Sequence, residues 1–150
     1  IPRTTNGCGI NSLEAATNKV NYDVLEFDAA TAEYAQAAIV MPSNWNAGTV
    51  TAKFHWTAAS GSGNVIFGLS GRAYADNNAL DQATGTAQTV TDTLLTAAYE
   101  HITSATSAIT LAGSPAAGQM VIFQLYRDAA VDTLGSDAQF LGVEITYTSV

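Results

Sequence analysis

One stretch of the sequence constrains the fold more than any other. Between residues 49 and 57 apolar side chains alternate strictly with polar ones, and the apolar members are Val50, Ala52, Phe54 and Trp56. A period of two places all of them on one face of an extended chain, which is typical of a half-buried β-strand. The preceding residues 46–48 (NAG) have the composition of a turn, because Asn and Gly tolerate a left-handed backbone. The stretch therefore predicts a turn followed by a strand that covers a core.

Similar patterns recur along the chain, and no segment is long enough for a helix that crosses between parallel strands. Residues 119–127 are apolar on both faces, as a central strand would be. Only single helical turns are expected, at residues 12–16 and 78–82. Eight or nine strands separated by turns predict an all-β fold, an antiparallel β-sandwich that is jelly-roll-like. The further expected strands are residues 22–28, 34–41, 65–75, 86–94, 99–103, 108–111, 119–127 and 140–147.

The length suggests one domain, and the irregular pattern of the first residues suggests that an arm precedes it. Residues 1–21 carry no sustained period, and we expect them to form an extended N-terminal arm that crosses to a neighbouring subunit or is a disordered tail. Residues 22–150 are expected to form a single β-sandwich domain, since 150 residues suit one core. Because residue 1 is Ile rather than Met, we also expect the numbering to begin inside a longer or processed product.

The charge balance argues against two classes of partner. Thirteen acidic residues stand against five Lys and Arg, a net charge of −8. So few bases predict no nucleic-acid groove and no attraction to an anionic membrane surface. No run approaches the roughly 18 apolar residues of a membrane helix, so membrane insertion is not expected. The single cysteine, Cys8, forms no internal disulfide and fits folding in a reducing compartment.

The residues that carry most enzyme chemistry are scarce. The chain has two histidines, His55 and His101, and neither lies near a Gly-x-Ser-x-Gly nucleophile motif, so both are interpreted as surface residues. Cys8 has no neighbouring Cys or His for a zinc site. Residues 76–81 are rich in Asp and Asn but lack the glycine and glutamate of an EF-hand. We expect no metal, no cofactor and no enzyme activity.

Paired carboxylates leave one catalytic alternative open, glycoside hydrolysis. Glu26 and Asp28 share one face of an expected strand, about 6–7 Å apart by strand geometry. A second acidic group comprises Asp128, Asp132 and Asp137. A catalytic acid needs an apolar pocket that raises its pKa, and the local sequence predicts none.

Aromatic side chains offer a different route to function, because sugar rings stack on their faces. Trp45 precedes the expected turn, at a position more often exposed than Trp56. Trp45, Tyr74 and Tyr99 are the candidate ligand-binding residues for a glycan. Packing at the rim of the fold or contacts between subunits are the alternative roles for these three side chains.

Segments spread over nearly the whole chain, in order, resemble a family of small virion-associated structural proteins of tailed bacteriophages and prophages. They are residues 2–8 (PRTTNGC), 16–21 (ATNKVN), 27–28 (FD), 33–36 (EYAQ), 41–51 (MPSNWNAGTVT), 85–93 (GTAQTVTDT), 113–116 (GSPA), 126–128 (YRD) and the loop with 132–134 (DTL). The family resemblance implies a non-enzymatic virion surface protein that is assembled in the host cytoplasm and contacts other virion proteins. Virion surface modules are often homotrimers, so a homotrimer is expected here, and the family offers no catalytic residues to carry over.

The resemblance favours a tail fibre or spike module that contacts the host envelope, with a host surface glycan as its expected ligand. A capsid decoration (cement) or head-fibre protein is the close alternative, and a polysaccharide depolymerase is a third.

Overall fold

The computed structural model describes residues 1–150 and contains nine strands and no helix. No helix long and apolar enough to cross a membrane is present. The strands are β1 (Gly9–Glu14), β2 (Asn21–Phe27), β3 (Tyr34–Val40), β4 (Trp45–Thr57), β5 (Asn64–Tyr74), β6 (Gln88–Thr93), β7 (His101–Ile102), β8 (Met120–Arg127) and β9 (Ala138–Ser149).

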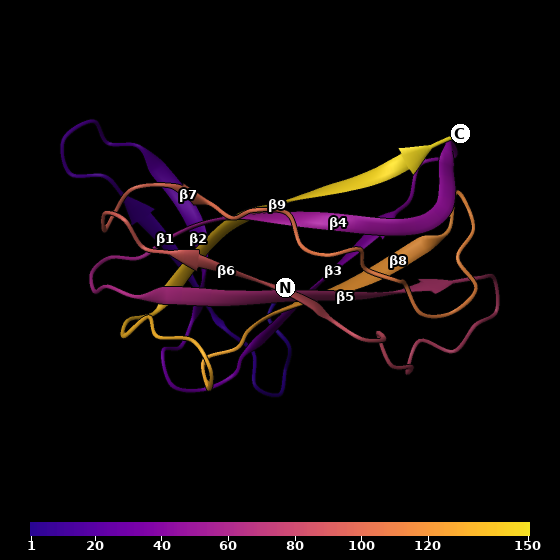
Figure 1. Cartoon of the computed structure of the whole chain (residues 1–150), viewed down its shortest axis with the longest axis horizontal. Helices are drawn as coiled ribbons and strands as arrows, with labels where there is room; N and C mark the ends of the chain where they lie inside the picture. Colours follow the sequence, from indigo (N-terminus) through magenta and orange to yellow (C-terminus); the bar gives the residue numbers. More distant parts are fainter.

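The strands form two antiparallel sheets. One has the order β1-β2-β9-β4-β7 and the other β3-β8-β5-β6. Figure 1 shows them as two layers, with β4 and β9 in one and β5 and β8 in the other. Pairing is nested: β2 pairs with β9, β3 with β8, β4 with β7 and β5 with β6. This nesting is the topology of an eight-stranded jelly roll, with β1 added at one edge. The predicted fold class is confirmed.

The central alternating strand behaves as predicted. Val50, Ala52, Phe54 and Trp56 on β4 are all buried, and the intervening side chains are more exposed. The core between the sheets is centred on Phe67 of β5. Its ring lies 5.5–6.2 Å, centroid to centroid, from the rings of Phe27, Phe54, Trp56 and Phe140. These aromatic contacts join the two layers.

The expected turn at residues 46–48 is wrong, because these residues lie within β4 as a β-bulge. Ala47 has a left-handed φ of 59°, and the Asn46 side chain accepts a hydrogen bond from the Gly48 amide at 2.8 Å. The chain reverses earlier, where the Trp45 amide donates to the Pro42 carbonyl at 3.1 Å. The composition indicated a left-handed residue correctly, and a bulge uses such a residue as readily as a turn does.

The N-terminal residues are part of the sandwich in this structure. β1 pairs antiparallel with β2, and Pro2 and Gly7 bridge to the start of β3. The helical turn expected at residues 12–16 is wrong, since residues 12–14 are extended and paired. No helical turn forms at residues 78–82 either. Of the expected strand at 108–111, a single bridge remains, in which Ile109 and Val50 exchange backbone hydrogen bonds of 2.8 and 3.1 Å.

The end of β8 carries a charge into the core. Arg127 is fully buried and pairs with the buried carboxylate of Asp132, with Nε to Oδ2 at 2.7 Å and Nη2 to Oδ1 at 3.1 Å. Its guanidinium also donates to the carbonyls of Phe27, Leu134 and Ser136 at 3.1, 2.6 and 2.8 Å. Arg127 thereby joins its own sheet, which contains β8, to β2 of the opposite sheet and to the loop between β8 and β9.

Candidate functional site

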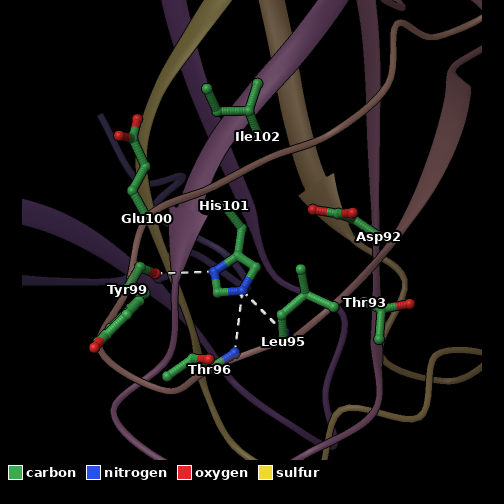
Figure 2. Close-up of a pocket in the computed structure, with 8 residues that line it drawn as sticks. All are labelled: Asp92, Thr93, Leu95, Thr96, Tyr99, Glu100, His101 and Ile102. Carbon is green, nitrogen blue, oxygen red and sulfur yellow. Dashed lines mark hydrogen bonds between the residues drawn. The ribbon is translucent and has the colours of Figure 1, made fainter.

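An open hollow of about 520 Å³ lies where β6 ends and β7 begins. It is formed by the end of β6, the loop of residues 94–100 and β7, whose pairing with β4 leaves its other edge free. Figure 2 shows His101 at its centre, with the other side chains around it. The lining residues are Asp92, Thr93, Leu95, Thr96, Tyr99, Glu100, His101 and Ile102.

The conformation of the loop places Tyr99 in solvent. The Tyr99 amide donates to the Thr96 carbonyl at 3.3 Å, and Ala98 between them has a left-handed φ of 64°. The Ala98 amide is held by the Ala58 carbonyl at 2.8 Å, at the end of β4. The turn is therefore anchored to the sheet, and the Tyr99 side chain is 67% exposed.

His101 forms the floor of the hollow. It is 7% exposed, and its ring packs against the Trp56 ring at a centroid distance of 5.1 Å. Its Nδ1 lies 2.9 Å from the Tyr99 carbonyl, and its Nε2 lies 2.9 Å from the Leu95 amide nitrogen (Figure 2). A carbonyl can only accept and an amide N–H can only donate, so Nδ1 carries the proton and Nε2 accepts. The imidazole is therefore neutral.

Two carboxylates stand around the floor. Asp92 Oδ2 accepts a hydrogen bond from the indole Nε1 of Trp56 at 2.8 Å, which fixes the Asp92 side chain. Glu100 Oε1 lies 2.7 Å from Nδ1 of His55, and the Glu100 side chain is 59% exposed. The Thr96 hydroxyl adds a further hydrogen-bonding group, and the Thr93 hydroxyl, which donates to Asn64 Oδ1 at 2.8 Å, can still accept. The hollow thus combines an exposed aromatic face with polar groups that can bond to ligand hydroxyls.

The structure brings only one of the three predicted ligand-binding residues to this hollow. Tyr99 lies on its rim, whereas Trp45 is 1% exposed and Tyr74 is 7% exposed. Trp45 and Tyr74 lie at the ends of β4 and β5 that are remote from it, since Trp56 pairs with His101 and Asn64 with Thr93. The Tyr74 hydroxyl donates to the Leu80 carbonyl at 3.0 Å. Neither Trp45 nor Tyr74 presents a ring face to solvent.

The expected exposure of Trp45 is wrong because of the bulge in β4. Between Trp45 and Val50, five residue steps of β4 run beside two steps of β9. The difference is an odd number of residues, and it moves the side chain of Trp45 from the outer to the inner face. The strand alternation without the bulge would have left it outside.

Sequence reasoning missed Asp92, Glu100 and the structural role of His101. The prediction that both histidines lie on the surface is wrong for His101, and His55 retains 30% side-chain exposure. No local pattern marks His101 as the buried residue, since its apolar neighbour Ile102 is 52% exposed and Tyr99, two residues before it, is exposed as well. Asp92 and Glu100 approach the same hollow only through tertiary contacts.

Four of the five carboxylates considered for glycoside hydrolysis, those of Glu26, Asp28, Asp132 and Asp137, are engaged in structural hydrogen bonds. Glu26 accepts from the Gln139 side chain at 2.9 Å, and Asp137 accepts from the Ala29 amide at 3.1 Å. The amides of Ala30 and Thr31 donate to Asp28 and hold its pKa below the ordinary value, opposite to what a catalytic acid needs. No cluster of three or more His, Cys, Asp or Glu side chains suitable for a metal is present.

Comparison with known proteins gives one described structural similarity. No protein-family model and no curated protein matches the sequence. The solved structure of TmCBM61, a carbohydrate-binding module, in complex with β-1,4-galactotriose matches with a TM-score of 0.45 and 10% sequence identity. The match covers 93% of this chain and 82% of that chain. At this level of similarity the bound sugar is a property of that module and is not transferred to this chain.

Proposed function

We propose that this protein is a non-catalytic glycan-binding β-sandwich that binds a neutral sugar at the hollow formed by residues 92–102. The observation that carries the proposal is the exposed, anchored ring of Tyr99 beside the carboxylates and hydroxyls of that hollow. An aromatic ring offers the apolar face of a sugar a flat surface, and it loses little conformational entropy on binding because it has only two side-chain torsions. The polar groups then bond to the sugar hydroxyls.

The charges around the hollow favour a neutral sugar over an anionic one. Asp92 and Glu100 both line it, no Lys or Arg does, and the neighbouring His55 is paired with Glu100. The chain as a whole carries a net charge of −8. A carboxylated or sulfated sugar would be repelled at short range, whereas neutral hydroxyls donate readily to carboxylate oxygens.

We further propose that the protein works at the surface of a bacteriophage virion, as a tail fibre or spike module that contacts the host envelope. The sequence resemblance to virion-associated proteins supports this role, and so does a sandwich stabilised without disulfides. Within the virion the chain is proposed to form a homotrimer beside other virion proteins. Exposed apolar side chains on β3 and β9, including Ile39, Val40 and Val143, suit such contacts.

A glycan array followed by calorimetry tests the binding site. Wild-type protein is expected to bind at least one neutral oligosaccharide, and Tyr99→Ala is expected to weaken that binding about tenfold or more because the stacking face is lost. Val131→Ala is the matched control, since Val131 is also 67% exposed but lies in the loop between β8 and β9. Absence of binding to every neutral glycan at millimolar concentration, or equal affinity of Tyr99→Ala and wild type, would overturn the proposed site.

The virion role has its own test. Particles purified from a strain that carries the gene are labelled with gold-conjugated antibody against this protein and viewed by electron microscopy. Gold on the tail is the expected result. Label on the capsid surface, or particles that lack the protein, would contradict the tail-module assignment.

A further inference from the structure

We infer that His101 is a positioning residue for the hollow and works only as the neutral imidazole, so that acidification releases the loop of residues 94–100. The consequence for sugar binding rests on the proposed function, since Tyr99 lies on this loop. The release of the loop is a property of the fold and can be observed without any ligand.

His101 connects both ends of the loop through one ring. Nε2 accepts from the Leu95 amide at 2.9 Å and lies 3.5 Å from the Thr96 amide, while Nδ1 donates to the Tyr99 carbonyl at 2.9 Å. The ring is held in turn against Trp56, the residue paired with His101 across β4 and β7. Tyr99 therefore keeps its position through contacts to a buried side chain.

Protonation removes the acceptor on which this arrangement depends. A proton on Nε2 would point at the Leu95 N–H, so that two donors face each other and the amide loses its partner. The imidazolium would also be buried against the Trp56 ring, where a charge is poorly solvated. The loop must move before the imidazolium can reach water. Histidine side chains in general gain this proton between about pH 5 and 8.

The charged groups around His101 do not replace the missing acceptor. On β6, Asp92 is bonded to the Trp56 indole, and on β4, His55 is bonded to Glu100 of the loop. Both carboxylates favour a positive charge nearby, but neither is bonded to Nε2. Protonation of His55 strengthens its pair with Glu100, which is the opposite of the effect at His101. A loss of order at acidic pH therefore reports His101 and not His55.

Nuclear magnetic resonance of ¹⁵N-labelled protein at pH 7.5 and 5.0 tests this inference. At pH 7.5 the ¹⁵N shifts of His101 are expected to show a protonated Nδ1 and an unprotonated Nε2. The hydrogen-exchange protection factors of the Leu95 and Thr96 amides are expected to fall about tenfold or more at pH 5.0, in line with the loss of a hydrogen bond and its acceptor. Protection of amides in the centre of β8 should remain constant.

Two variants separate the histidines. In the His101→Gln variant the new side-chain amide offers an acceptor and a donor but does not titrate. The exchange protection of the loop amides in this variant is therefore expected to be the same at both pH values. His55→Gln keeps His101 and is expected to retain the acid transition of the wild type. A proton on Nε2 at pH 7.5, the absence of a transition in wild type, or an undiminished transition in His101→Gln would overturn the inference.

The same proteins distinguish failure of this inference from failure of the proposed function. Affinity is measured by calorimetry at both pH values with a neutral oligosaccharide that wild type binds on the array at pH 7.5. Binding that weakens at pH 5.0 in wild type but not in His101→Gln supports the inference, and binding that is independent of pH in wild type overturns it. If no oligosaccharide binds, the proposed function fails, and the exchange experiment alone decides the role of His101.

Discussion

The substitution Arg127→Met tests whether the buried ion pair at the end of β8 holds the two sheets and a loop together. Methionine has a similar length and no charge, so it leaves the Asp132 carboxylate buried without its partner. The guanidinium of Arg127 makes two bonds to Asp132 and donates to three backbone carbonyls. Those carbonyls belong to Phe27, Leu134 and Ser136, and all three bonds are lost.

The expected loss is about 3–5 kcal/mol of unfolding free energy, because removing one partner of a buried ion pair leaves an uncompensated charge. A domain of this size is stabilised by only about 5–15 kcal/mol, so the change is a large fraction of the total. The melting temperature should fall by roughly 6–20 °C. In the double variant Arg127→Met with Asp132→Leu, no charge is left unpaired. It should therefore be more stable than Arg127→Met alone.

Urea unfolding followed by circular dichroism and tryptophan fluorescence measures these differences, with both tryptophans buried in the folded state. Asp132→Leu alone completes the double-mutant cycle and is expected to be destabilising, since it leaves the guanidinium unpaired. A loss below about 1 kcal/mol for Arg127→Met would refute the reasoning. Additive effects of the two single substitutions would refute it as well, because the pair would then have no coupling energy.

Two further predictions concern backbone sterics and thiol chemistry. Gly63 has a φ of 115°, and a Cβ there would collide with the Thr133 carbonyl oxygen. Gly63→Ala should therefore lower the unfolding free energy measured in urea by more than about 2 kcal/mol. Gly118 has a φ of 77° but nothing within 4 Å of the added Cβ, so Gly118→Ala should lower it by only about 1 kcal/mol. Equal losses for the two glycine variants would show that the collision is relieved cheaply. Burial, followed by the nearby charge of Glu33, raises the pKa of Cys8 to about 11, so native protein at pH 8 should react with iodoacetamide about a hundredfold or more slowly than urea-unfolded protein. Because the pKa is raised in the folded state, the neutral thiol stabilises the fold below about pH 9, and this contribution is lost as the pH rises through about 11. Comparable labelling rates in the folded and unfolded states would contradict the raised pKa.

The strands that are predicted well from the sequence are those in which apolar side chains follow a clear local pattern. β4 shows the expected alternation of burial, and its buried residues form much of the core. β8 was expected to be a central strand because it is apolar on both faces, and it does lie inside its sheet, with every second side chain buried. β1 was missed because its side chains are mostly exposed, and an edge strand without a buried face has no apolar period to read. The expected strand at 108–111 has strand-like composition but only one bridged residue facing Val50.

The candidate site was predictable in one residue only. Tyr99 was singled out as an aromatic side chain available for stacking, and it lies on the rim of the hollow. Trp45 was singled out for the same reason, but the bulge beside it changes the face on which it lies. Asp92 and Glu100 come from different segments, and nothing in the local sequence of either predicts that they meet around His101.

The all-β class, the sandwich and the inner face of β4 follow from the order of the residues, because a period of two is a local property that burial on one side imposes. The positions of charges and aromatic rings relative to solvent depend instead on how the strands and loops pack. Arg127 is buried because a loop of the same chain returns Asp132 to it, and His101 is buried because β7 pairs with β4 beside Trp56. Such contacts depend on strand register and on the path that a loop takes, and neither leaves a local pattern in the sequence.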